Sequence, residues 1–588
     1  MALFTPSQSP AVVVKEIDAT GGVPNVQTST GAIVGNFRWG PVGQRVLISN
    51  EADLIDQFST PDTTSTIDFH NASYFLRYSN SLQVVRQATS AAKNAHSTKY
   101  KTAGRGPRAV GYAVQAINNK NVFDANTSLD SDGHTFIGRF PGALGNGLRV
   151  SICPANSTAF NAWDYKASYD GAPGSSALDS NAGGTGTELH LAVIDQNGEF
   201  TGTKGTVLES YPYVSAATNS VLADGSTNYV KNVVNERSKY IYMVNFDSDY
   251  TAANAGTAMT PGTQKTYISG LTTHVHYDFD SGANSAALGT AEIATGHDLF
   301  EDEEAVEVDF LIAPGMSSRA DQTTVTNDLV ANAIARKDCI AVSSPARSDV
   351  VGVTNEATAT TNVVATAATF TKSSYLVMDG NYIKVYDKFN DQFIEIPAAS
   401  SVAGLMAETD RVAASWFSPA GTRRGQLLGV TAINYNPNKT RRDTLYKAGV
   451  NPVVNVAGSG VCLFGDKTLF NRPSAFDRIN VRRLFLTLER AISQAAKNVM
   501  FEFNDEFTRA EFVNVIEPVL RDVKARRGIT DFRIIADETV NTPAVVDRNE
   551  FIANIFIKPA RSVNYVTLNF VAVRTGVDFT EVVGTAGV

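Results

Sequence analysis

The clearest hydrophobic pattern of the chain lies between residues 474 and 576. After a candidate helix cap at Asn480, apolar residues recur at three- and four-residue steps, the spacing of one buried helix face. These positions are Val481, Leu484, Phe485, Leu488, Ile492, Ala495 and Val499. Cations stand between them, at Arg482, Arg483, Arg490 and Lys497. We therefore predict an amphipathic helix with one buried face and one basic face.

A second helix is predicted after the sequence FEFND. Thr508 and Glu511 have the capping-box spacing, in which a hydroxyl and a carboxylate each satisfy a free backbone N–H group. Pro518 is expected to kink this helix. Gly528 predicts its end, because glycine tolerates a left-handed turn and the preceding cations suit a helix C-terminus. The apolar stripe is Phe512, Val515, Ile516, Val519 and Val523, and the cations are Lys524, Arg526 and Arg527.

Three β-strands are predicted after the helices, at residues 532–536, 550–557 and 563–573, because branched and aromatic residues dominate them. In the last strand, alternate apolar residues from Val566 to Ala572 share one face. Two helices and three strands make a compact α/β module over residues 474–576.

Short apolar strands are also predicted near the two ends of the sequence, over residues 11–18 (AVVVKEID) and 577–584 (VDFTEVVG). A strand this short needs a sheet to join, since its backbone groups and apolar side chains are otherwise exposed. Two partners stay open for the N-terminal strand: an edge of the chain's own sheet, or a sheet of another copy. We treat residues 1–20 and 577–588 as terminal arms.

The rest of the chain shows two kinds of sequence pattern. Residues 21–97 and 303–473 carry strand and helix patterns in alternation, which favours a mixed sheet covered by helices. Residues 98–302 are rich in small and polar residues with strand-like islands, which favours a β-rich insertion with long loops. We therefore expect a discontinuous α/β domain, residues 21–97 plus 303–473, that carries the insertion.

Composition narrows the classes of protein. With 588 residues, 43% of them hydrophobic and 19% charged, the chain is expected to fold into about three to five globular domains. The net charge of -9 disfavours nucleic-acid binding. Cys153, Cys339 and Cys462 are too few and too far apart for a disulfide framework or a zinc cage, so folding in a reducing compartment is expected. Neither a signal peptide nor a membrane-spanning segment is apparent.

Catalytic and metal-binding patterns are weak. In GVCLFGDKT, Gly460, Gly465, Lys467 and Thr468 resemble a phosphate-binding loop, but Asp466 breaks the register, so a strand followed by a turn is the better interpretation. All seven histidines lie at or before His297; His274 and His276 share one strand face without a third ligand. The acidic stretch 298–310 has no ordered ligand spacing and is read as a solvated face. We predict no catalytic residues, no metal site and no cofactor.

Several sequence blocks resemble the tail sheath protein family of T4-like contractile-tailed bacteriophages. They include FDRINVRRLF (residues 476–485), NTPAVVDRNEF (541–551), PARSVNYVTLNFVA (559–572), SYLVMDGNYIKVYDKFND (374–391) and WFSPAGTRRGQL (416–427). The resemblance covers residues 12–584 except the middle insertion. Within the insertion, RFPGALGNGLRVSI (139–152) also matches. Residues 98–138 correspond to a shortened form of the family's outermost domain.

The resemblance implies an α/β and β multidomain fold: a C-terminal sheath module with a mixed sheet flanked by helices, a discontinuous α/β middle domain, an outward β-rich insertion and extended arms. It implies a helical homopolymer of stacked six-subunit rings around an inner tube, whose contraction drives the tube through the host envelope. The implied partners are the tail tube protein, the baseplate and tail terminator proteins, with neither nucleic acid nor membrane insertion. The implied location is the virion tail, assembled in the host cytoplasm.

Two sets of site residues follow from that hypothesis. The arms are expected to add to sheets of neighbouring copies through Val12, Val13, Val14, Val577, Phe579, Val582 and Val583. The basic end of the second helix is expected to face an acidic tube, through Lys524, Arg526 and Arg527.

Two alternatives stay open. One is the sheath of an R-type bacteriocin or another contractile injection system. The other is a carbohydrate-binding or enzymatic protein with its site in the insertion, where aromatic rings at Trp163, Tyr165, Tyr169, Tyr211 and Tyr213 could stack on sugars.

Overall fold

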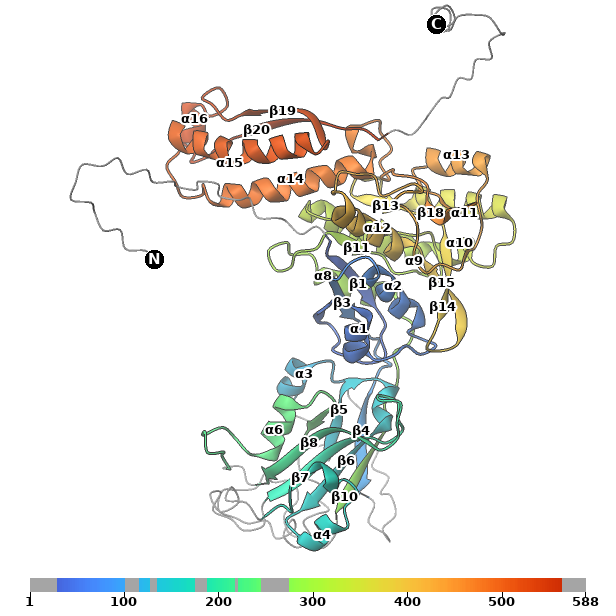
Figure 1. The fold of residues 1–588 in the computed structure, drawn as a ribbon, viewed down its shortest axis with the longest axis vertical. Helices are drawn as coiled ribbons and strands as arrows, with labels where there is room; N and C mark the ends of the chain where they lie inside the picture. The colour runs from blue at the N-terminus through green and yellow to red at the C-terminus, as the bar shows by residue number, and fades with distance from the viewer. Residues whose placement is uncertain are drawn as a thin grey trace, which may run out of the picture. The chain divides into compact units, whose positions relative to one another are not determined.

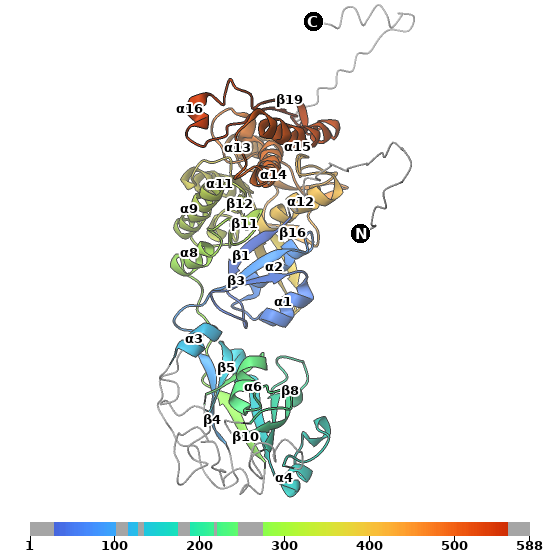
Figure 2. The ribbon, with the colours of Figure 1, turned by 90° about the vertical axis from the view of Figure 1, so that its left-hand side faces the viewer.

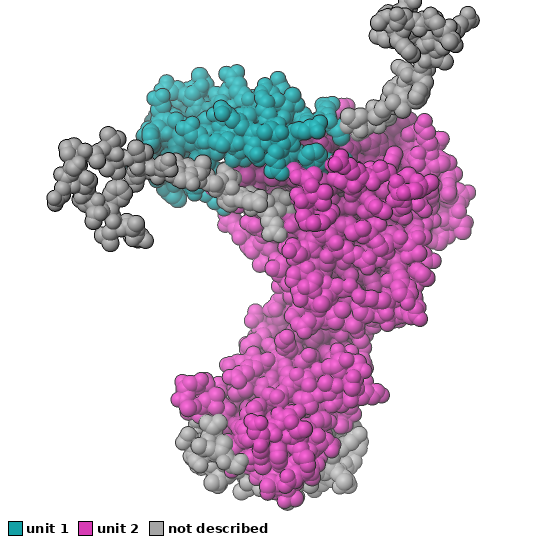
Figure 3. Space-filling model, in the orientation of Figure 1, with its two compact units in different colours: residues 1–23, 416–418, 495–588 teal, residues 24–415, 419–494 magenta. Residues whose placement is uncertain are grey.

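The computed structural model describes residues 29–100, 116–126, 135–174, 188–216, 220–244 and 274–562. The chain forms a mixed α/β fold of several sheets and helices (Figure 1). It divides into two compact units (Figure 3): among the described residues, unit 1 comprises residues 416–418 and 495–562, and unit 2 comprises the rest. Both predicted arms and the strand predicted at residues 563–573 lie outside the described residues.

The central sheet of unit 2 has six strands in the order β13-β12-β11-β1-β3-β2, and all neighbours are parallel except β2 and β3. Strand β1 precedes the insertion and pairs with β11, which follows it, so the chain on both sides of the insertion builds one sheet. The strands are β1 (Gly31–Gly35), β2 (Arg45–Ile48), β3 (Leu82–Arg86), β11 (Phe310–Ile312), β12 (Ile340–Ser343) and β13 (Leu376–Met378). The alternation of strand and helix patterns predicted for residues 303–473 is seen in β11, α9 and β12, whose two strands pair in parallel.

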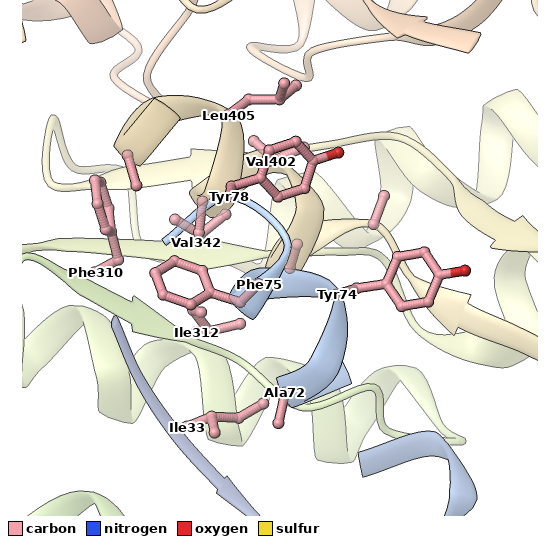
Figure 4. Close-up of a cluster of buried hydrophobic side chains, with 14 of the residues drawn as sticks. Ile33, Ala72, Tyr74, Phe75, Tyr78, Phe310, Ile312, Val342, Val402 and Leu405 are labelled. Carbon is pink, nitrogen blue, oxygen red and sulfur yellow. The ribbon is translucent and has the colours of Figure 1, made fainter. Parts of the chain in front are cut away.

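Helices cover both faces of this sheet (Figure 2). One face packs against α2 and α12, with Ile33, Ile312 and Val342 meeting Phe75 and neighbouring apolar side chains (Figure 4). The opposite face, which carries the alternate strand residues Ala32 and Leu311, packs against α8, α9 and α11. The helices of this domain are α1 (Glu51–Phe58), α2 (Thr66–Leu76), α8 (Thr290–Asp298), α9 (Arg319–Arg336), α10 (Arg347–Val350), α11 (Glu356–Thr369), α12 (Ala399–Val412) and α13 (Lys439–Lys447). Because both faces are covered, every residue of β1, β11, β12 and β13 is buried.

Two small antiparallel sheets complete the domain. One has three strands in the order β15-β14-β16 and the other pairs β17 with β18. Their bounds are β14 (Tyr382–Asp387), β15 (Gln392–Pro397), β16 (Ala432–Ile433), β17 (Val453–Val456) and β18 (Gly460–Leu463).

The insertion is a seven-stranded antiparallel sheet in the order β8-β7-β6-β10-β4-β5-β9. Its strands are β4 (Asn94–Tyr100), β5 (Phe136–Pro141), β6 (Leu148–Pro154), β7 (Glu188–Asp195), β8 (Thr206–Ser215), β9 (Ile241–Met243) and β10 (Val275–Asp280); the helices are α3 (Lys120–Ala125), α4 (Ser157–Asn161) and α6 (Val230–Arg237). Trp39 is 3% exposed in the core of this sheet, edge-on to Phe140 and Phe200.

The chain then enters α14 (Ile479–Lys497), which starts one residue before the predicted cap, and continues in unit 1 with α15 (Glu506–Ala525), β19 (Ile529–Ile535), α16 (Pro543–Val546) and β20 (Asn554–Pro559). Strands β19 and β20 form a two-stranded antiparallel sheet. Phe512, Ile516, Leu520 and Val523 are the buried residues of α15, which packs on β19.

Candidate assembly site

Two of the four cations on the predicted basic face of α14, Arg482 and Arg483, are buried, so the separation into one buried face and one basic face is wrong for these two residues. Arg482 and Arg483 are only 7% and 4% exposed. The Arg482 guanidinium lies 4.2 Å from each of the Tyr375 and Phe476 ring centroids and donates to Ser374 Oγ. Burial lowers the pKa of Arg482. Stacked, planar contacts of this kind suit arginine better than lysine.

Arg483 and Arg490 bind carboxylates of the central domain. Arg483 forms an ion pair with Asp410 and donates from Nη1 to the Met406 carbonyl at 2.7 Å. Arg490 donates from Nη1 to Asp309 Oδ1 at 2.6 Å and from Nη2 to the Asp338 carbonyl at 3.1 Å. These bonds join residues 479–494 of α14 to the central domain of unit 2.

Asp309, the partner of Arg490, is a buried carboxylate. It is 8% exposed, and its Oδ2 accepts the Thr30 N–H at 2.9 Å. Burial raises the pKa of Asp309 to about 6, although Arg490 and the Thr30 N–H lower it. The carboxylate therefore depends on Arg490 to remain charged. An amphipathic pattern places every charged residue in solvent, so it could not show that these three arginines bind the central domain. The one indication in the sequence was that all three positions hold arginine, which suits buried ion pairs better than lysine does.

The cap of α15 also differs from the prediction. Asp505 is the N-cap residue, and its side chain accepts the Thr508 N–H at 2.8 Å. Thr508 lies inside the helix, so the predicted capping box of Thr508 and Glu511 is wrong. Aspartate at the N-cap satisfies a free N–H group and places a negative charge at the positive end of the helix dipole. Pro518 lies within the helix.

Helix α15 ends at Ala525, and Arg527 rather than Gly528 takes the left-handed conformation, with φ +69°. The Gly528 N–H donates to the Val523 carbonyl at 2.8 Å. A Cβ atom on Gly528 would lie 2.7 Å from Val523 Cγ1 and 3.0 Å from the Trp416 ring. Close packing, and not a left-handed turn, is therefore what requires glycine at this position.

The predicted tube-facing cations have partners inside unit 1. Lys524 Nζ lies 3.0 Å from Asp531 Oδ1, and Arg526 Nη1 lies 3.6 Å from Asp522 Oδ2. The Arg526 guanidinium also lies 5.0 Å from the Trp416 ring centroid. Exposed pairs of this kind contribute little stability, about 0 to 1 kcal/mol. Among the described residues, no ion pair involves Arg527.

The β19–β20 sheet offers edges for strand addition. Within the part of the chain that the structure describes, neither strand has a second neighbour. A two-stranded sheet is marginally stable by itself and needs a packed helix or further strands, so added strands would stabilise it further. The arm residues predicted to do so, Val12 to Val14 and Val577 to Val583, lie outside the described residues.

The loop that resembled a phosphate site is closed by its own side chains. Strand β18 ends at Leu463, and no helix starts at Thr468. Asp466 accepts from Arg478 at 2.8 Å and from the Tyr446 hydroxyl at 3.1 Å. The Lys467 ammonium donates to the Tyr446 carbonyl at 2.8 Å. The ammonium and the carboxylate are thus engaged within the domain.

The histidine pair in the insertion is packed against other rings. His274 and His276 have ring centroids 5.0 Å apart, and burial, followed by the nearby Arg149, lowers the pKa of His276 to about 4. Among the described residues, no group of three or more His, Cys, Asp or Glu side chains could hold a metal ion. No helix in the described ranges has the length and apolar content needed to cross a membrane.

The aromatic residues considered for sugar stacking belong mainly to a core. Trp163, Tyr169 and Tyr211 are 1%, 9% and 6% exposed. His190 stacks on Tyr169 with ring centroids 4.5 Å apart, and Tyr213 meets the same imidazole edge-on. Tyr165 is half-buried and lies edge-on to Trp163. The sugar-stacking hypothesis is therefore wrong for the three buried rings.

Comparisons with known proteins agree with these observations. Two family models match, the phage tail sheath protein central domain over residues 286–469 and the phage tail sheath C-terminal domain over residues 471–572. The tail sheath protein of Enterobacteria phage T4 is 33% identical, with 98% of this chain and 99% of that protein covered. The tail sheath protein of Vibrio phage KVP40 is 30% identical with the same coverage.

Solved structures show the same fold at low sequence identity. The sheath tail protein from Listeria innocua is 11% identical with a TM-score of 0.54, covering 91% of this chain and 93% of that one. The sheath tail protein from Desulfitobacterium hafniense is also 11% identical, with a TM-score of 0.50 over 94% of this chain and all of that one. The chain belongs to the phage tail sheath protein family.

Proposed function

We propose that this chain is the structural subunit of a contractile phage tail sheath, which polymerises as stacked six-subunit rings around an inner tube. Contraction of this sheath drives the tube through the host envelope. The observation that carries the proposal is the similarity to the T4 tail sheath protein over nearly the full length of both chains. The role is structural, with no catalytic residues and no cofactor.

Copies connect through their arms. Residues 1–20 and 577–588 of one copy add strands to the module formed by residues 474–576 of its neighbours. Among the described residues no further strand lies beside β19 or β20, which supports this, because strand addition links chains by backbone hydrogen bonds. Contacts of this head-to-tail kind propagate into rings and helices. The segments beside the arms act as hinges.

Unit 2 of each subunit turns largely as a rigid body during contraction. The anchors at Arg482, Arg483 and Arg490 support this, because they hold most of α14 against the central domain of unit 2 through buried bonds. Contraction then needs rearranged contacts between copies and no nucleotide: the extended polymer is held by a barrier and the contracted one has the more favourable contacts.

The C-terminal module faces the tube, and the β-rich insertion, which runs from β4 to β10, points outward. Lys524, Arg526 and Arg527 then make weak ionic contacts to an acidic tube surface, which break on contraction. The exposure of the Lys524 and Arg526 side chains, 47% and 52%, supports this role. Reversing all three charges should weaken assembly on purified tubes while leaving the fold intact. Unchanged assembly on tubes would remove this assignment.

The remaining partners are the baseplate and the tail terminator proteins, and the subunit belongs to the virion tail after assembly in the host cytoplasm. Relatives from three phages support a virion over a bacteriocin. The direct test is negative-stain microscopy of the purified full chain. We expect rings or tubes. A small species of fixed size under all assembly conditions would contradict the proposed function.

A further inference from the structure

Asp309 lies where three neighbouring parallel strands of the central sheet begin. The Asp309 N–H donates to the Thr30 carbonyl at 2.9 Å, and Asp309 Oδ2 accepts the Thr30 N–H at 2.9 Å. The Asp309 carbonyl accepts the Ile340 N–H, also at 2.9 Å. Because Gly31, Phe310 and Ile340 are the first residues of β1, β11 and β12, these bonds fix the starts of the three strands to one another.

The other oxygen of the same carboxylate holds α14. Arg490 Nη1 donates to Asp309 Oδ1 at 2.6 Å, and both side chains are nearly buried, with 11% of Arg490 and 9% of Asp309 exposed. Separating a buried ion pair is costly, because it leaves a charge in the interior without its counter-charge. A movement of α14 that withdraws Arg490 therefore acts directly on the Asp309 carboxylate.

The packing of α14 around this ion pair leaves a small cavity. The cavity has a volume of about 10 Å³, room for about one water molecule. Its lining includes Asp309, Ile340, Leu486, Thr487 and Arg490. Apolar contact between the helix and the sheet is thus incomplete here, so the polar bonds of Arg490 hold α14 at this point.

We propose that Asp309 couples the docking of α14 to the start of β1, so that displacement of either segment loosens the bonds that hold the other. The carboxylate is one rigid group, bound at Oδ1 by Arg490 and at Oδ2 by the Thr30 N–H. It cannot turn toward one partner without weakening its bond to the other. Such coupling is reciprocal, and it typically changes an equilibrium by about 5- to 150-fold.

The coupling is a property of the single chain and does not depend on the proposed polymer. It connects the first described residues of the chain, Ser29 and Thr30, with the helix that leads into unit 1. In the proposed polymer, a pull on the N-terminal arm would reach α14 through Asp309, and a movement of α14 would reach the arm.

Hydrogen exchange of the purified full chain tests the coupling. Arg490→Gln should make the amides of residues 30–35 exchange about 5- to 150-fold faster, whereas β14 (Tyr382–Asp387), outside the central sheet, should exchange as in the wild type. The matched control is Arg482→Gln, which alters a buried arginine of the same helix that contacts the Tyr375 and Phe476 rings. This control should speed exchange in α14 and leave residues 30–35 unchanged.

An Asp309→Asn background shows whether the effect passes through this carboxylate. Asparagine keeps an oxygen that can accept the Thr30 N–H but lacks the negative charge that binds Arg490. In this background, Arg490→Gln should add no further acceleration at residues 30–35. If Arg490→Gln does not fold, Arg490→Lys serves the same comparison, because an ammonium group lacks the planar fork that binds Asp309 and the Asp338 carbonyl together.

Three results would overturn the inference: unchanged exchange at residues 30–35 in the Arg490 variant, the same acceleration there with aspartate or asparagine at position 309, or an equal acceleration there by Arg482→Gln. Tube formation is not part of this measurement. A negative outcome would therefore remove the coupling and leave the proposed function standing.

Discussion

At the residue scale, the contacts of a residue in the fold explain its identity better than the sequence pattern around it does, as Gly528 shows. Gly528 was identified from sequence as a helix-end residue, and the helix does end beside it. Its physical reason is different: Arg527 takes the positive φ, and Gly528 provides room for Val523 and the Trp416 ring. A sequence pattern cannot show this, because Trp416 is more than one hundred residues away in the chain.

Gly528→Ala tests that reason. The added methyl group would overpack the contact with Val523 and Trp416, so we expect a loss of about 1–3 kcal/mol in the stability of unit 1. Faster hydrogen exchange in α15 and β19 would report it. The control is Gly147→Ala, where a Cβ atom would meet Asn197 only at ordinary contact distance, 3.5 Å. Equal exchange in wild type and Gly528→Ala would contradict the packing argument.

A buried carboxyl group predicts a pH dependence. Asp379 accepts from Ser344 Oγ at 2.6 Å and from the Asn381 N–H at 3.1 Å, and burial raises its pKa to about 7. Between pH 4 and 7 the native state therefore keeps a proton that the unfolded chain loses, so stability from this group falls as pH rises. Asp379→Asn should flatten the urea-denaturation midpoint over this range relative to wild type, whereas Asp547→Asn, at an exposed position, should not. An unchanged slope in Asp379→Asn would refute it.

At the element scale, the periodicity of the sequence identified α14 and α15, because each helix buries an apolar face. The enrichment in branched and aromatic residues placed β19 and β20 to within a few residues. The periodicity failed on the polar face of α14. Burying Arg482, Arg483 and Arg490 requires carboxylates, carbonyls and rings from distant segments, for example Asp309 and Asp410, and periodicity carries no information about those partners. The proposed assembly depends on the arms. The sequence predicts that each arm contains a strand, but it does not show which sheet that strand joins.

Arg490→Leu tests the anchoring of α14. Removing one partner of a buried ion pair leaves Asp309 without its cation, so we expect a loss of about 3–5 kcal/mol by urea denaturation. The matched control is Arg411→Gln, whose pair with Glu408 is exposed on the arginine side (72%) and should cost less than about 1 kcal/mol. The double variant Asp309→Asn/Arg490→Leu should recover part of the loss. Equal effects of Arg490→Leu and Arg411→Gln would argue against an anchoring role.

At the scale of the whole molecule, the two units suit different roles in a polymer. Unit 2 holds the doubly covered central sheet, the β-rich insertion and most of α14, joined by buried bonds. Unit 1 has a two-stranded sheet beside which no further strand lies among the described residues. Under the proposed function, unit 2 supplies the stable part of the subunit and unit 1 receives strands from other copies.

The most direct test of the account is a cryo-electron microscopy reconstruction of the assembled polymer in which residues 11–18 and 577–584 are traced. We predict that both segments lie as strands in sheets that include β19 and β20 of adjacent copies. Both segments folded onto their own chain, with no strand shared between copies, would contradict it.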